Sequence, residues 1–199
     1  MSVKAAYTIF RTLCWPFVTL VYPRRTYGRA HIPGAGAYLI CGNHSSMIDP
    51  FMVACSMGVG CQIHFMAKAE LFRIPIVGAV LRGIGMFPVD RESGGAAAFM
   101  TAMKLLKKGE KVGMFPEGTR IAADEASAAK AGAVRLAARL GVPIVPVHIP
   151  RKKKVLRWNK MVIGAPYVVE LDKKAGAEEY EQAADELMMK IRALGESVQ

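Results

Sequence analysis

The stretch from Asn43 to Asp49, NHSSMID, places a histidine five positions before an aspartate, and Pro50 follows the aspartate directly. In a helix these two positions lie about 140° apart around the axis, so His44 and Asp49 could not meet on one helix face. They could meet across a loop, because an aspartate followed by proline is typical of an N-cap and first helical residue. A carboxylate on one imidazole nitrogen fixes the tautomer, so the other nitrogen can act as a general base. The spacing is compatible with a catalytic pair or with a capped helix beside an ordinary histidine.

Ser45 and Ser46 lie between the two residues but are poor candidates for a hydrolase nucleophile. A hydrolase nucleophile elbow reads GxSxG, with its serine on a tight turn, and NHSSMID has neither glycine. The cysteines form no CxxC pair and show no other spacing typical of a metal site. We therefore expect buried free thiols, and no bound metal, at Cys14, Cys41, Cys55 and Cys61.

Short apolar strands that alternate with helices would position residues 43–49. A buried strand is predicted at 36–43, just before the loop, and a helix at 50–58, just after it. The other predicted strands are 26–33, 61–67, 86–91, 111–120 (running into a loop), 142–149 and 160–171. The other predicted helices are 70–85 (in short pieces broken by Pro75), 94–110, 127–141 and 176–195. This order predicts a single α/β domain with a mostly parallel central sheet flanked by helices, and with its site at the carboxyl ends of the strands.

The N-terminal segment is apolar from Ala5 to Tyr22 and would be about 27 Å long as a helix. It is interrupted by Arg11 and by Pro16, whereas a membrane span needs about 20 uninterrupted apolar residues. Lys4, Thr8 and Arg11 recur at helical spacing. We predict an interfacial membrane helix in a membrane-associating segment, residues 1–24, ahead of the domain at 25–199. The alternative is a helix docked on the protein's own core.

The chain carries a net charge of +11, which favours a partner rich in phosphate: an anionic membrane, nucleic acid, or a phosphorylated ligand. Few aromatic residues are interleaved with the basic ones, so nucleic-acid binding is not expected. The basic block RKKKVLRWNK at residues 151–160 includes Trp158 and would suit anionic headgroups, although a solvated loop is the alternative.

Three further blocks follow NHSSMID in order: GMFPVDR at 85–91, FPEGTR at 115–120 and VPIVPV at 142–147. Together the four blocks resemble the conserved motifs of the glycerolipid acyltransferases, specifically the bacterial 1-acyl-sn-glycerol-3-phosphate acyltransferase family. The resemblance extends over about residues 25 to 170. It implies transfer of a fatty acyl group from acyl-CoA or acyl-carrier protein to lysophosphatidic acid. On this reading His44 is the general base, Asp49 orients it, and no cofactor or metal takes part.

The resemblance also implies residues for substrate binding. Arg120 would grip the acceptor phosphate, because a guanidinium is a planar, bidentate donor, and Glu117 would orient Arg120 or the acceptor hydroxyl. Gly118 would allow close backbone approach. Arg91 and Lys68 are further phosphate candidates. Apolar residues between positions 65 and 87 could line a slot for the acyl chain, although they could equally be plain core.

The expected location is the cytoplasmic face of the cell membrane, as a peripheral or monotopic protein. Two other functions are compatible with parts of the sequence. One is the same transfer to another lysolipid or to a lipid alcohol, and the other is non-catalytic binding to an anionic membrane or nucleic acid. A binding protein has no need of a His44–Asp49 pair, so the pair favours an enzyme.

Overall fold

The computed structural model describes residues 2–58, 60–90, 95–116, 127–172 and 174–198. Within them a seven-stranded sheet has the order β1-β7-β6-β2-β5-β3-β4. The strands are β1 (Arg24–Tyr27), β2 (Tyr38–Gly42), β3 (Ile63–Lys68), β4 (Phe87–Val89), β5 (Lys111–Met114), β6 (Ile144–His148) and β7 (Asn159–Ile163). Neighbouring strands run parallel except at the β6–β7 pair, which is antiparallel. The prediction of an α/β domain with a mostly parallel sheet is confirmed.

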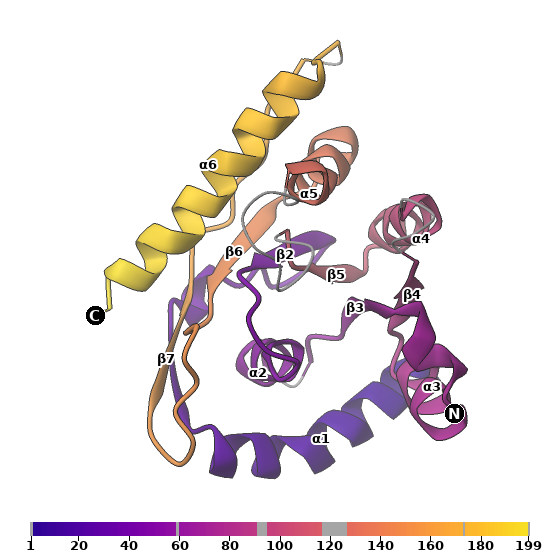
Figure 1. Ribbon diagram of the computed structural model, residues 1–199, viewed down its shortest axis with the longest axis vertical. Coiled ribbons are helices and arrows are strands. Elements are labelled where there is room, and N and C mark those ends of the chain that lie inside the picture. The colour runs from indigo at the N-terminus through magenta and orange to yellow at the C-terminus, as the bar shows by residue number, and fades with distance from the viewer. Residues whose placement is uncertain (1, 59, 91–94, 117–126, 173, 199) are drawn as a thin grey trace.

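Helices cover both faces of the sheet (Figure 1). The α-helices are α1 (Val3–Val21), α2 (Asp49–Ser56), α3 (Pro75–Gly83), α4 (Ala96–Lys107), α5 (Ser127–Leu140) and α6 (Ala177–Glu196), and two short 3₁₀ helices are η1 (Arg29–His31) and η2 (Ala69–Arg73). Helices α4, α5 and α6 lie above the sheet in Figure 1, and α1 and α2 lie below it. The two layers enclose two separate apolar clusters, one on each face.

Strand β2 lies in the middle of the sheet and contributes to both clusters. All five of its residues are buried. Leu39 and Cys41 pack on the α4–α6 side, whereas Tyr38 and Ile40 pack on the α1–α2 side. A strand that is covered on both faces has no solvated side, which is why its sequence is a continuous apolar run.

Strands β1 and β7 end well before the positions that the sequence predicts. Strand β1 ends at Tyr27 because Gly28 turns the chain at a φ of +73°, close to a neighbouring carbonyl: a Cβ at this position would lie 2.0 Å from the Ile163 oxygen. Strand β7 ends at Ile163 rather than at residue 171. Pro166 has no N–H to donate, and beyond it Tyr167 makes only an isolated bridge to Ile144.

Helix α1 packs along α2 with Tyr7, Arg11 and Val18 buried. The Arg11 side chain turns towards the protein, where its Nε and Nη2 donate to the carbonyls of Ala54 (3.2 Å) and Cys55 (3.3 Å) at the end of α2. These carbonyls have no partner within their own helix, and a cation favours the negative end of the helix dipole. Of the helices that the structure describes, none combines the length and the apolar character needed to cross a bilayer.

We predict that Arg11→Met lowers the free energy of unfolding by about 1–3 kcal/mol, because two buried carbonyls lose a charged donor. Chemical unfolding would measure the loss. Arg192→Met, at an exposed position on α6, removes the same charge and serves as the control. Equal losses in the two variants would contradict a capping role for Arg11.

Candidate active site

Three chain segments meet at the carboxyl ends of neighbouring parallel strands. These are residues 43–48 after β2, Phe115 after β5, and residues 149–153 after β6. Open α/β sheets place their ligand sites at this edge, because the loops that follow adjacent strands converge there.

Asn43 fixes the start of the first loop. Its side-chain amide donates to the Ile149 carbonyl (2.7 Å) and accepts from the Ile149 amide (2.8 Å), so the loop after β2 is joined to the segment after β6. Asn43 is 4% exposed, and this reciprocal pair satisfies both ends of its buried amide.

The structure brings His44 and Asp49 together across this loop. Nδ1 of His44 lies 2.9 Å from Oδ2 of Asp49. The His44 side chain is 19% exposed and that of Asp49 is fully buried. This arrangement directs Nε2 of the imidazole away from the carboxylate, so it is the nitrogen that can exchange a proton with a substrate.

The surroundings of Asp49 differ from the predicted N-cap. Helix α2 begins at Asp49 itself, with Pro50 in its first turn, and Oδ2 accepts from the preceding amides of Ser45 and Ser46, each at 2.8 Å. The expectation that Asp49 bonds the first helical amides is therefore wrong: its carboxylate binds the loop that bends back over the helix.

The charge state of Asp49 follows from these contacts. Burial alone raises the pKa of a carboxyl group, but here the contacts with His44 and Lys153 and the two backbone amides outweigh it. The pKa of Asp49 is consequently lower than its ordinary value, and the carboxylate remains ionised at neutral pH.

Aromatic side chains hold the His44 ring from one side. Phe115 stacks on it, with ring centroids 4.3 Å apart and planes at 16°, and Phe65 stacks in turn on Phe115, with centroids 5.9 Å apart. The imidazole is thus oriented both by a hydrogen bond in its plane and by a ring against its face.

Lys153 is a member of this site that the sequence reasoning missed. Its Nζ lies 2.6 Å from Oδ1 of Asp49, and its side chain is only 7% exposed. We grouped it with the basic block 151–160 as a headgroup contact. Its position in the segment that follows β6, five residues beyond His148 at the carboxyl edge of the sheet, was the signal that could have identified it.

The predicted substrate-binding residues are only partly covered by the structure. Lys68 is exposed at the carboxyl end of β3, on the same edge of the sheet as the pair. Arg91, Glu117, Gly118 and Arg120 lie outside the described residues. Among the residues that are described, no group of three or more histidine, cysteine or acidic side chains could hold a metal ion.

An apolar recess lies next to the aromatic stack. It is formed between α1, α2 and the neighbouring strands, and its lining includes Phe10, Phe51, Phe65, Ile84 and Met86. Three of these residues come from the stretch 65–87 that was proposed for an acyl slot. Because Phe65 belongs to both the lining and the stack, the recess adjoins the far end of the stack, with Phe115 between Phe65 and the His44 ring.

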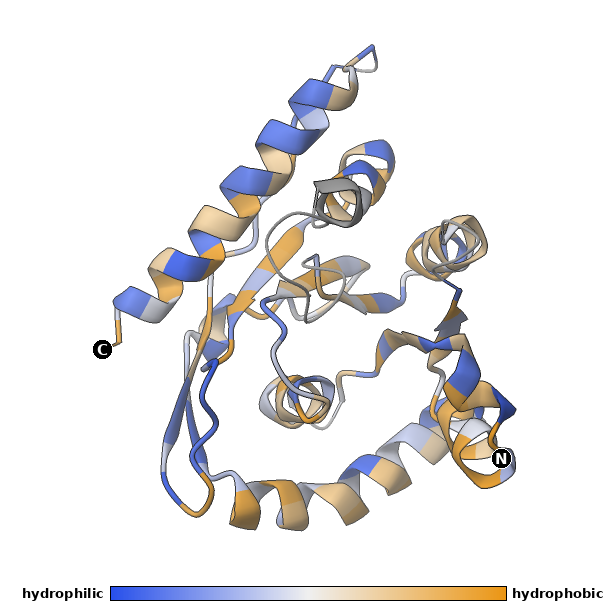
Figure 2. Cartoon of the chain, viewed as in Figure 1, coloured by the Kyte–Doolittle hydropathy of each residue, from blue (hydrophilic) through white to orange (hydrophobic). Residues whose placement is uncertain are grey.

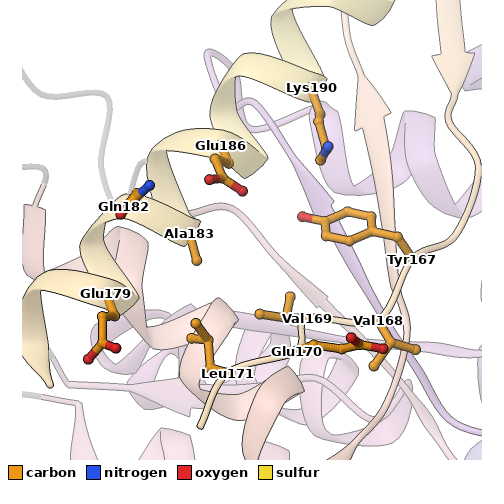
Figure 3. Close-up of a pocket in the computed structure, with 10 residues that line it drawn as sticks. All are labelled: Tyr167, Val168, Val169, Glu170, Leu171, Glu179, Gln182, Ala183, Glu186 and Lys190. Carbon is orange, nitrogen blue, oxygen red and sulfur yellow. The ribbon is translucent and has the colours of Figure 1, made fainter. Parts of the chain in front are cut away.

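A second hollow lies between residues 167–171 and α6, and it shares no lining residue with the pair (Figure 3). Three carboxylates, those of Glu170, Glu179 and Glu186, border it together with Lys190. Acidic side chains repel a phosphate, so this hollow does not suit a phosphorylated substrate despite its volume of about 320 Å³.

Comparison with known proteins gives the following similarities. The sequence model of the family named Acyltransferase matches residues 24–150. A 1-acyl-sn-glycerol-3-phosphate acyltransferase from Bacillus subtilis is 38% identical over 150 residues, which are 71% of this chain and 72% of that protein. A protein of the same name from Borreliella burgdorferi is 35% identical over 61% of this chain and 49% of its own length.

Among solved structures, the fold is similar to that of the 1-acyl-sn-glycerophosphate (LPA) acyltransferase, PlsC, from Thermotoga maritima. The two superimpose with a TM-score of 0.70 at 22% sequence identity, over 97% of this chain and 78% of the other. At this identity the match supports the fold alone.

The lowered pKa of Asp49 predicts how stability depends on pH. The ionised carboxylate contributes its full stabilisation above the pKa that Asp49 has in the unfolded chain, about 4. This contribution is lost as the pH falls through the lower pKa that Asp49 has in the folded protein. The difference in unfolding free energy between the parent and Asp49→Asn should therefore be largest above about pH 4 and shrink below it. Chemical unfolding across a pH series measures it. The exposed Asp185→Asn is the control, and a difference that stays constant with pH would contradict the assignment.

Proposed function

This chain belongs to the acyltransferase family, and from that premise we propose that it acylates 1-acyl-sn-glycerol-3-phosphate to phosphatidic acid. The donor would be an acyl thioester, carried by coenzyme A or by acyl-carrier protein. Support comes from the names of relatives that match most of the chain. The single observation that carries the proposal is the His44–Asp49 pair, held at 2.9 Å on the carboxyl edge of a parallel sheet.

The chemistry requires one proton to be moved and no covalent enzyme intermediate, because a thioester is already activated. Nε2 of His44 takes the proton of the acceptor hydroxyl as its oxygen attacks the thioester carbonyl. The tetrahedral intermediate then collapses, the carbon–sulfur bond breaks, and the imidazolium returns the proton to the departing sulfur. General-base help of this kind contributes about 10²–10⁴-fold, so correct placement of both substrates must supply the rest.

Asp49 makes His44 suitable for this role. When Nδ1 carries the hydrogen that it donates to Oδ2, Nε2 is left unprotonated and can accept a proton. The negative carboxylate also stabilises the imidazolium that forms during attack. Phe115 restricts the ring to this plane, so the histidine needs little reorganisation before reaction.

We assign the acceptor phosphate to basic residues, of which Lys68 is the one that the structure describes, at the carboxyl end of β3. Arg120 is the main candidate because a guanidinium binds phosphate through two parallel hydrogen bonds, with Arg91 and Lys68 as further cations. Glu117 would orient Arg120 or the hydroxyl, and Gly118 would let the backbone approach the ligand. The apolar recess beside Phe65 matches a fatty acyl chain in chemical character, since its walls are mainly aromatic and aliphatic, and its volume of about 40 Å³ is enough for a small part of such a chain.

We further propose that the protein lies on the cytoplasmic face of the membrane as a peripheral or monotopic protein. The outward side of α1 exposes Leu13 (71%), Phe17 (63%) and Leu20 (72%). Helix α3 and the loop before β7 also carry exposed apolar side chains, including Ile76 and Trp158. Figure 2 shows hydrophobic residues on α1, on α3 and at the tip of this loop, all along the lower side of the view.

Basic residues accompany this apolar surface, as a negatively charged lipid surface requires. Arg25 lies over the ring of Trp158, with its guanidinium carbon 5.3 Å from the ring centroid, and the exposed Arg151, Lys152 and Lys154 are in the same loop. Each basic residue near an anionic surface adds about 1 kcal/mol of attraction. An apolar helix face flanked by cations is the pattern of an interfacial helix.

A screen with purified protein tests the activity. We expect acyl transfer from acyl-CoA or acyl-carrier protein to lysophosphatidic acid, and much less to lysophosphatidylcholine or monoacylglycerol, with products identified by mass spectrometry. His44→Ala should lower turnover by at least about 100-fold without changing the fold, because the base is lost. His31→Ala, at the exposed last position of η1, is the matched control.

Two results of this screen would overturn the assignments. Near-normal turnover in His44→Ala would show that His44 is not the general base. Preferred transfer to an unphosphorylated acceptor would show that the substrate is another lipid alcohol.

The membrane assignment predicts that a triple variant, Leu13, Phe17 and Leu20 each to Gln, no longer sediments with vesicles of phosphatidylglycerol and phosphatidylcholine. The net charge is unchanged, so a loss reports on apolar contact alone. A variant with Met100 and Met189 each changed to Gln, at exposed positions on α4 and α6, should still sediment. If the triple variant still binds vesicles, the basic block 151–160 and not α1 would be the segment that anchors the protein to the membrane.

A further inference from the structure

Lys153 differs from the other basic residues around it. Arg151, Lys152 and Lys154 are exposed, whereas the Lys153 side chain is 7% exposed and points to the start of α2. There its ammonium lies 2.6 Å from Oδ1 of Asp49 and also donates to Oγ of Ser45. A lysine is seldom buried unless it is paired, so this position requires the carboxylate.

The chain around Lys153 is built to hold this position. The buried Asn159 accepts from the Lys154 amide (2.9 Å), and its own amide donates to the carbonyls of Lys154 (2.9 Å) and Arg157 (3.0 Å). Leu156 has a φ of +54°, which is costly for a side chain of this size, and its N–H bonds the Val21 carbonyl of α1 at 2.8 Å. The loop is therefore fixed on both sides of its tip.

We propose that Lys153 is a positioning residue for the acyl transfer, which fixes the Asp49 carboxylate so that its second oxygen stays directed at His44. The inference rests on the proposed function, since it concerns how the same pair is held. Oδ2 accepts from His44, Ser45 and Ser46, whereas the partner of Oδ1 among the described residues is the Lys153 ammonium at 2.6 Å. The positive charge of Lys153 offsets the negative charge on Oδ1.

Both oxygens must be compensated for the carboxylate to stay ionised in a fully buried place. If Lys153 were neutral, Oδ1 would be a buried, partly charged atom without its cation, and rotation of the carboxylate towards solvent or its protonation would become favourable. Either change would weaken the bond to Nδ1. Lys153 therefore acts on His44 through Asp49, and a role in binding the acceptor phosphate is less suited to an ammonium already engaged by two oxygens.

The test separates positioning from substrate binding by steady-state kinetics. Lys153→Met, close in length but uncharged, should lower kcat by about 10- to 100-fold, the usual effect of removing a group that orients a functional histidine, while both KM values change less than about 2-fold. Lys153→Arg should recover part of kcat, because it keeps the charge. Lys107→Met, at the exposed end of α4, loses the same charge and should match the parent.

A double-mutant cycle with Asp49→Asn completes the test. If Lys153 works through Asp49, Lys153→Met should change kcat less than about 2-fold once Asp49 is neutral. Should the single variant fail to fold, the double variant, in which both charges are removed, should be more stable than it, because the single change leaves a buried carboxylate without its cation. An additive loss of kcat, or a rise in the acceptor KM alone, would overturn the proposal and make Lys153 a substrate ligand.

The activity of the parent protein separates a failure of the Lys153 proposal from a failure of the proposed function. If the parent transfers no acyl group to any lysolipid, the proposed function is wrong, whereas the unfolding free energies of the four proteins in the cycle still report whether Lys153 and Asp49 are coupled. A coupling close to zero in those energies would overturn the role of Lys153 by itself.

Discussion

The loop that carries His44, at the carboxyl edge of the sheet, depends on one buried carboxylate. Asp49 is fully buried yet ionised, and a lone carboxylate in such a place would cost several kcal/mol. Two backbone amides, an imidazole and an ammonium offset that cost. The amides and the imidazole belong to the loop after β2 and the ammonium to the segment after β6, so both segments must be in place. The shape of the loop, the direction of the histidine ring and the path of the chain after β6 all follow from satisfying this group.

Helix α2 connects the loop that carries His44 to the outer helix α1. It has only eight residues, so the group that begins it and the carbonyls that end it are less than three turns apart. Asp49 binds the loop of residues 43–48 at the first end, and Arg11 of α1 binds the carbonyls at the other end. The apolar helix that we assign to the membrane and the His44 ring are thus connected through one short, rigid element.

Local patterns were enough to predict the fold and the central pair. The apolar run of β2, the Asp49–Pro50 start of α2 and the loop between them are all encoded within about fifteen residues, and the structure has them as predicted apart from the amides that Asp49 binds. The inward turns of Arg11 and Lys153 could not be predicted this way. Both looked like surface cations, and each is buried by a partner that the fold brings in from far along the chain.

The reciprocal bonds between Asn43 and Ile149 join positions 106 apart, and the bond that Lys153 donates to Ser45 joins positions 108 apart. Contacts at such separations form late, because a long chain must be closed before they give any stabilisation. During synthesis, β2 and α2 leave the ribosome well before β6 exists to hold their loop. A nascent chain therefore carries its histidine and aspartate through the synthesis of 100 further residues, from Asp49 to Ile149, before the segment that aligns them exists.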